Sequence, residues 1–117
     1  MRPLLVLMLL FTSVNVISQE GLYRSIKSSQ SKITFSNDIK ENEKTNILKY
    51  DYLYNGAGVG IGDFDKNGYP DIFFAGNMVD DQLYLNKGQF KFENTSIKSG
   101  ITNQGWSTGV CVFDINN

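Results

Sequence analysis

The stretch "GVGIGDFDKNGYPDIFF", which runs from Gly58 to Phe74, decides the fold. Two apolar segments flank an acidic loop that contains glycine and proline, a pattern that predicts two strands joined by a turn. In the first segment Val59 and Ile61 share one face and glycines occupy the other. A strand lined by glycines allows a close approach of another backbone to that face. The continuous apolar run "DIFF" predicts the second strand.

The pattern continues after this stretch with two further strands. "QLYLN" and "QFKFEN" alternate in polarity, and "NKG" between them predicts a turn. Four short strands in succession, each bounded by Gly, Asn or Asp, predict an all-β fold built on a four-stranded antiparallel meander. The side chains that we expect to face inward on the last two strands are Leu83, Leu85, Phe90 and Phe92.

The sequence of the first predicted strand and its acidic loop recurs later in the chain, at a spacing typical of repeat folds. "GVGIGDFDKN" begins at Gly58 and "GVCVFDINN" begins at Gly109, which gives a period of 51 residues (109 − 58). Periods of this size indicate propellers or solenoids. One four-stranded sheet fits within the period, and this is the content of a propeller blade. The equivalent pairs are Val59 and Val110, Ile61 and Val112, Asp63 and Asp114, and Asp65 and Asn116.

The acidic loop has the spacing of a calcium-binding turn. Oxygen-bearing side chains at loop positions 1, 3, 5 and 9 can converge on one cation, with a main-chain carbonyl at position 7 and a glycine, Gly68, at the sharp turn of position 6. Calcium takes six to eight oxygen ligands, whereas magnesium requires a stricter octahedron. Transition metals prefer imidazole or thiolate, which the loop lacks. The candidate calcium ligands are Asp63, Asp65, Asn67, Asp71 and the carbonyl of Tyr69.

The loop is not an EF-hand, because position 12 holds Phe74 instead of a bidentate glutamate and the flanks are predicted strands. A bound cation would therefore fix a turn between two strands. The alternative is a turn stabilised by Asp and Asn side chains without a metal. The second repeat offers Asp114 and Asn116 and then the sequence stops, so we expect a partial second loop and no complete second site.

Composition excludes several classes of function. The chain has 117 residues, a net charge of −1 and no histidine. Its length is that of one domain at most. The absence of histidine excludes triads with a histidine base and most zinc sites. The lack of a basic excess argues against nucleic-acid binding. The lone cysteine, Cys111, lies in an apolar run and is predicted to be a buried, inert thiol.

The N-terminal half divides into three parts. Residues 1–18 have a positive start and an apolar run, Leu4 to Phe11, which predict a signal peptide and hence a secreted, cell-surface or periplasmic protein. The run is too short to span a membrane, so we expect no transmembrane segment after cleavage. Residues 19–49 form a polar lead-in with one short strand near 32–35. "LKYDYLYN" then predicts a strand with three tyrosines on one face: Tyr50, Tyr52 and Tyr54.

The stretch from Tyr50 to Asn117 resembles the FG-GAP/VCBS repeat family. More narrowly, it is similar to exported proteins related to cartilage acidic protein, which carry an ASPIC/UnbV module further on. The resemblance implies a β-propeller, usually of seven blades, with calcium in the loop between the first two strands of a blade. Residues 50–108 would be the first blade and 109–117 the start of a second, truncated repeat, so we expect the chain to be a fragment. The implied ligands are Asp63, Asp65, Asn67 (where the family often has Asp), the main chain of Tyr69, and Asp71.

Three functions are compatible with this sequence. The first is a non-catalytic, calcium-binding module that binds a protein or glycan at the cell surface. The alternatives are the propeller part of a larger polysaccharide-active enzyme and a non-functional truncated remnant. Asp80 and Asp81 are adjacent acids whose side chains point apart on an extended segment, and no acid pair outside the loop has catalytic separation, so no catalytic residue is assigned. Trp106 either stacks on a sugar or packs at the start of the next blade.

Overall fold

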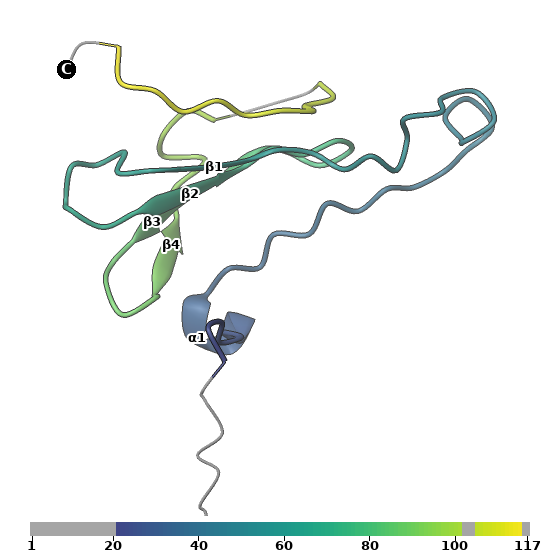
Figure 1. Cartoon of the computed structure of the whole chain (residues 1–117). Helices are drawn as coiled ribbons and strands as arrows, with labels where there is room; N and C mark the ends of the chain where they lie inside the picture. Colours follow the sequence, from purple (N-terminus) through teal and green to yellow (C-terminus); the bar gives the residue numbers. More distant parts are fainter. Residues whose placement is uncertain (1–20, 102–104, 116–117) are drawn as a thin grey trace, which may run out of the picture.

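The computed structural model describes residues 21–101 and 105–115, and the predicted signal peptide lies outside these ranges. The four strands form one antiparallel sheet in chain order (Figure 1). The all-β meander predicted from the sequence is therefore confirmed, and its content is that of one propeller blade. The elements are α1 (Ser28–Ser31), β1 (Val59–Gly62), β2 (Asp71–Phe74), β3 (Gln82–Asn86) and β4 (Phe92–Asn94).

The register of the sheet separates two faces of different character. Val59 pairs with Phe74 across β1 and β2, and Ile72 pairs with Tyr84 across β2 and β3. Residues that pair directly across a ladder share a face. We call one side the aromatic face and the other the glycine face. The aromatic face carries Val59, Ile61, Ile72, Phe74, Tyr84 and Phe92, and the glycine face carries Gly60, Gly62, Phe73, Leu83 and Leu85.

The lead-in packs on the aromatic face. The ring of Phe35 stacks on that of Phe74 at a centroid distance of 4.8 Å. The N–H of Thr34 donates to the hydroxyl oxygen of Tyr84 at 3.3 Å, and Tyr84 is fully buried. The short strand predicted near 32–35 is wrong, because this segment lies across the face of the sheet through its side chains instead of pairing with a strand edge. The polar lead-in therefore covers part of the aromatic face.

The segment 105–115 packs on the opposite, glycine face, as Figure 1 shows for the chain that runs along β1. A Cβ atom added at Gly60 would lie 2.6 Å from Val110 Cγ1 and 2.7 Å from Val112 Cγ2. At Gly58 an added Cβ would lie 2.6 Å from the backbone nitrogen of Val110, so the close approach of another backbone that the glycines predict is confirmed there. Cys111 is exposed, and the prediction that it is buried is wrong. The alternation that directs the two valines to the sheet leaves the cysteine on the other side.

Two further predictions are wrong: the strand with three tyrosines on one face, and the inward orientation of Phe90. Residues 51–54 form turns in which Leu53 N–H donates to the carbonyl of Tyr50, so Leu53 is buried while Tyr52 and Tyr54 are exposed. Phe90 lies in the turn between β3 and β4 with a φ of 55° and is 55% exposed. A side chain in a tight turn does not continue the alternation of the strand that follows it.

A buried amide joins the segments around the sheet. Asn77 is 3% exposed, and its side-chain nitrogen donates to the carbonyls of Gly56 at 3.2 Å and Ser107 at 2.9 Å. Its N–H donates to Asn37 Oδ1 at 2.9 Å. The Asp81 carboxylate accepts from Gly76 N–H at 2.7 Å and from the Ser107 hydroxyl at 3.1 Å. These bonds tie the lead-in and the segment 105–115 to the turn after β2.

Within residues 21–101 and 105–115, no helix has the length and apolar character that crossing a bilayer would need.

Candidate metal centre

The acidic loop occupies residues 63–70, between the end of β1 and the first residue of β2. Gly62 and Asp71 pair across the two strands, so the loop leaves and re-enters the sheet at one point. Two residues with positive φ reverse the chain, Lys66 at 58° and Gly68 at 86°. Glycine adopts such a φ without the steric cost that a side chain brings. The structure therefore places Gly68 at the sharp turn that the spacing requires.

Three carboxylates of the loop converge. Asp63, Asp65 and Asp71 each offer one oxygen, and these oxygens lie within 4.8 Å of one another. Like charges at this separation repel, and a cation between them would offset the repulsion. The structure thus brings together the residues at loop positions 1, 3 and 9, although they span nine positions of the sequence.

Asp71 is the buried member of the group, with no exposed surface. Its Oδ2 accepts the N–H of Phe64 at 2.7 Å, and its Oδ1 accepts the N–H of Asn86 at 2.7 Å. Hydrogen bonds to a charged acceptor are short and strong. Asp71 therefore connects the start of the loop, the start of β2 and the end of β3.

Asp63 and Asp65 are exposed, and their carboxylates accept hydrogen bonds from backbone N–H groups of the same loop. Asp63 accepts the N–H groups of Asn67 at 3.0 Å and Gly68 at 2.8 Å. Asp65 accepts the N–H of Asn67 at 3.3 Å and pairs with the ammonium group of Lys87 at 3.4 Å. Lys87 is a cation already present beside the three carboxylates, and sequence reasoning did not single it out.

Asn67 and Tyr69 occupy positions 5 and 7. Asn67 Oδ1 accepts the N–H of Tyr69 at 2.8 Å, and Asn67 Nδ2 donates to the carbonyl of Asn86 at 3.0 Å. An amide oxygen has two lone pairs, so Oδ1 keeps one for a cation. The Tyr69 ring lies over Gly88, where an added Cβ would be 3.6 Å from Tyr69 Cζ. Both residues therefore also fasten the loop to the turn after β3.

Asn86 is the second residue that sequence reasoning missed. It is 5% exposed, its Nδ2 donates to the carbonyl of Pro70 at 3.0 Å, and its Oδ1 accepts the N–H of Gly88 at 2.9 Å. The available signal was an asparagine at the end of a strand just before a Lys-Gly turn, because Asn side chains commonly hydrogen-bond the backbone two residues on.

The second acidic loop is described in part. Asp114 is exposed, and with Asp63 and Lys66 it lines a hollow of about 490 Å³ between the two loops. Asp114 does not belong to the cluster of three carboxylates. Asn116 lies outside the described residues. The two predicted residues of this loop are therefore not brought together as a site in the described part of the chain.

Comparison with protein-family models gives one match. Residues 63–117 match the model of the FG-GAP-like repeat, which covers the acidic loop, β2 to β4 and the start of the second acidic loop. Comparison with curated proteins gives no significant match, and the same holds for solved structures. The match supports an FG-GAP-like repeat over residues 63–117, in a sheet that has the form of one β-propeller blade.

Proposed function

We propose that this chain is an exported, calcium-binding β-propeller repeat module without catalytic activity, which binds a protein or glycan at the cell surface. The observation that carries the proposal is the convergence of Asp63, Asp65 and Asp71 in the loop of an FG-GAP-like repeat. The signal peptide predicted at residues 1–18 and the resemblance to exported proteins related to cartilage acidic protein support export.

The donor set of the loop suits calcium. Side-chain oxygens of Asp63, Asp65, Asn67 and Asp71, together with the main-chain carbonyl of Tyr69, would hold the ion. All are hard oxygen donors of the kind that calcium takes in flexible geometry. The ion would neutralise the mutual repulsion of the carboxylates and fix the loop against β3, with no part in any covalent chemistry.

The surface that would contact a partner lies on the turns before β1. Tyr52 and Tyr54 are 65% and 61% exposed on a segment that projects away from the sheet (Figure 1). Tyrosine is enriched at protein interfaces because it combines a large apolar ring with a polar end. Loops held by a rigid sheet are common sites of recognition. These two side chains are therefore the first to replace in a binding assay.

Calcium binding is tested by urea unfolding of the chain after treatment with a chelator, with and without added calcium. Extracellular calcium modules have Kd values of about 10⁻⁴–10⁻³ M, so about 10 mM calcium should raise the free energy of unfolding by about 1.4–2.7 kcal/mol. We expect a smaller effect of magnesium and no effect of calcium on the double variant Asp63→Asn, Asp65→Asn.

The matched control replaces two exposed acids outside the loop, Asp51→Asn with Asp80→Asn, and should keep the full response to calcium. An equal response in the loop variant and the wild type would show that calcium acts elsewhere. Export is tested separately by the intact mass of the protein recovered outside the cytoplasm. A chain that retains residues 1–18 there would contradict cleavage of a signal peptide.

A further inference from the structure

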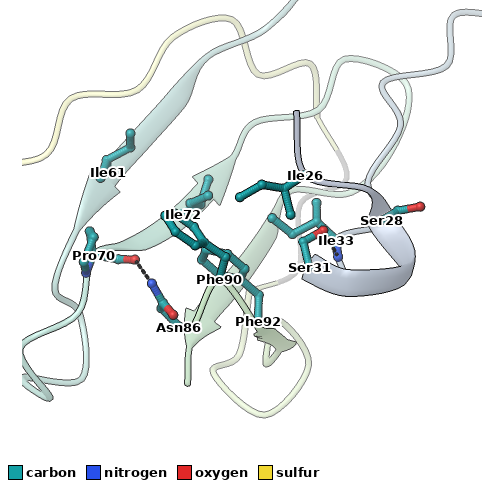
Figure 2. Close-up of a pocket in the computed structure, with 10 residues that line it drawn as sticks. All are labelled: Ile26, Ser28, Ser31, Ile33, Ile61, Pro70, Ile72, Asn86, Phe90 and Phe92. Atoms are coloured by element: carbon teal, nitrogen blue, oxygen red, sulfur yellow. Dashed lines mark hydrogen bonds between the residues drawn. The ribbon is translucent and has the colours of Figure 1, made fainter. Parts of the chain in front are cut away.

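An apolar pocket of about 450 Å³ separates α1 from the aromatic face of the sheet. Its volume lies within the range of small-molecule pockets, which is about 300–1,000 Å³. Seven of the ten residues that line it are apolar, and none of the ten carries a charge. Figure 2 shows Ile26 and Ile33 of the lead-in on one side of the pocket, with Ile72 of β2 and Phe90 facing them.

The wall that the lead-in supplies depends on a reversal of the chain at α1. Lys32 follows α1 with a φ of 65°, and its N–H donates to the carbonyl of Ser28 at 2.7 Å. This reversal is why Ile26, before α1, and Ile33, after it, line the same pocket. Beyond Ile33 the ring of Phe35 stacks on β2 and fixes the lead-in to the sheet. The lead-in is thus anchored beside the pocket without filling it.

The turn between β3 and β4 supplies the opposite wall. Gln89 and Phe90 both have a positive φ, of 53° and 55°, which residues other than glycine rarely adopt. Such strain persists where surrounding contacts hold it, and it is common at ligand-binding positions. Here Asn86 holds the turn, since its side chain bonds Gly88 and the carbonyl of Pro70 (Figure 2). The ring of Phe90 is thereby kept at the pocket, where it is 55% exposed.

Positive charge borders the pocket on both walls. Lys27, Lys32 and Lys91 each lie in sequence between two residues that line the pocket. All three are exposed, and they form no ion pair within residues 21–101 and 105–115. The acids next to lining residues are already engaged, Asp71 by backbone N–H groups and Glu93 by an ion pair. An apolar pocket with unbalanced positive charge at its border favours an apolar ligand with negative charge.

We propose that this pocket binds a small apolar molecule that carries one anionic group, such as an aromatic carboxylate. The apolar part would lie between Ile26, Ile72 and Phe90, and its removal from water would supply most of the affinity. The anionic group would lie at the border, near Lys27 and Lys91, and would distinguish this ligand from neutral molecules of the same shape. None of the candidate calcium ligands lines the pocket, so the proposal does not depend on calcium.

The first test maps a probe on the full wild-type chain. The probe is anilinonaphthalene sulfonate (ANS), a fluorescent apolar anion, and the chain is labelled at the δ methyl groups of isoleucine. We expect the NMR signals of the isoleucines that line the pocket to shift together and to saturate at one ANS per chain. The signals of isoleucines outside it should stay in place. Those that should shift are Ile26, Ile33, Ile61 and Ile72, and those that should not are Ile97 and Ile115.

Unmoved signals of the four pocket isoleucines would overturn the proposal, as would equal shifts at all six. Sedimentation of the chain without ANS adds a further check. A wild-type dimer that ANS dissociates would make a second copy the occupant and would also overturn the proposal. These measurements need no variant, so they hold even where a substitution prevents folding.

The second test removes the aromatic wall. Phe90→Gly deletes the ring and also relieves the positive φ, so the chain should keep its fold. We expect ANS to bind this variant several-fold more weakly in a fluorescence titration. The matched control is Phe113→Gly, at a phenylalanine that is 70% exposed and outside the pocket, and it should bind ANS as wild type does. Equal affinity of Phe90→Gly and wild type would overturn the proposal, and so would equal losses in the two variants.

The third test concerns the anionic group. Lys27→Gln with Lys91→Gln should weaken ANS binding several-fold, whereas Lys40→Gln with Lys44→Gln removes the same charge from exposed positions away from the pocket and should not. Phenylnaphthylamine, which lacks the sulfonate, should bind wild type more weakly than ANS and should not respond to either lysine pair. Equal effects of the two lysine pairs on ANS, or binding of the neutral probe as tight as that of ANS, would overturn the assignment of an anionic ligand.

Discussion

Replacement of Asp71 by asparagine tests whether this carboxylate has a structural role that does not depend on a metal. Asp71→Asn keeps the shape, but one of the two oxygens becomes an NH₂ group that faces a backbone N–H, that of Phe64 or Asn86. The loss of a charge-assisted bond that leaves a buried donor unsatisfied costs about 3 kcal/mol. The substitution also removes the repulsion between position 71 and the carboxylates of Asp63 and Asp65, which raises the free energy of unfolding by about 1 kcal/mol. The net expectation is a loss of about 2 kcal/mol.

The assay is urea unfolding in the presence of a chelator. The fluorescence of Trp106, the only tryptophan of the chain, reports the transition, since its ring lies edge-on to Tyr50 at 5.4 Å. For a slope of about 1 kcal/mol per molar urea, a loss of about 2 kcal/mol lowers the midpoint by about 2 M. The control is Asp65→Asn. It loses an exposed ion pair worth at most about 1 kcal/mol and relieves a similar repulsion, so its midpoint should stay near that of wild type.

An Asp71→Asn midpoint equal to that of wild type in chelator would refute the reasoning. It would mean that the two backbone N–H groups find other partners, and that Asp71 matters through a metal alone. Equal losses in Asp71→Asn and Asp65→Asn would refute the distinction between the buried and the exposed carboxylate. A change of slope without a change of free energy would point to the unfolded state instead.

Three other outcomes are expected. Gly60→Ala should lower the free energy of unfolding by about 1–3 kcal/mol, because its Cβ overlaps the docked valines, whereas Gly109→Ala, with open space around it, should stay near wild type in the same urea assay. Lys87→Met should tighten calcium binding several-fold in calorimetry, because the Lys87 ammonium group no longer competes with calcium for the carboxylate of Asp65, an interaction worth about 1 kcal/mol. An unchanged affinity for calcium would contradict this competition. The hydrogen bond and the charge of Lys98 hold the pKa of Glu93 below its usual 4.5. The stability from this pair is complete above pH 4.5 and is lost as the pH falls through the lowered pKa. Lys98→Ala should therefore raise the pKa of Glu93 in an NMR titration.

The regular part of the fold follows from local pattern. The four strands could be predicted because each alternates or runs apolar between turn residues. The approach of the segment 105–115 could be expected because Gly60 and Gly62 leave no side chains on that face of β1. The acidic loop could be proposed because position along a tight turn determines which side chains point inward.

The errors came from contacts between distant segments. Nothing local in the polar lead-in shows that Phe35 stacks on Phe74, and this contact replaces the predicted strand. The tyrosine alternation before β1 was overridden by turns that bury Leu53. Lys87 and Asn86 were missed at the candidate site because the loop numbering runs along one segment, whereas these two residues reach the loop from the end of β3.

The docking of the lead-in on the aromatic face determines the order in which the chain can fold. Thr34 meets Tyr84 across 50 residues of sequence, and Asn37 meets Asn77 across 40. Contacts between residues so far apart form slowly, because a long loop must close before they contribute. The surface on which Phe35 lies does not exist until β2 and β3 have paired. The lead-in precedes the sheet in synthesis, and we expect it to reach its place last, after the strands that come later in the chain.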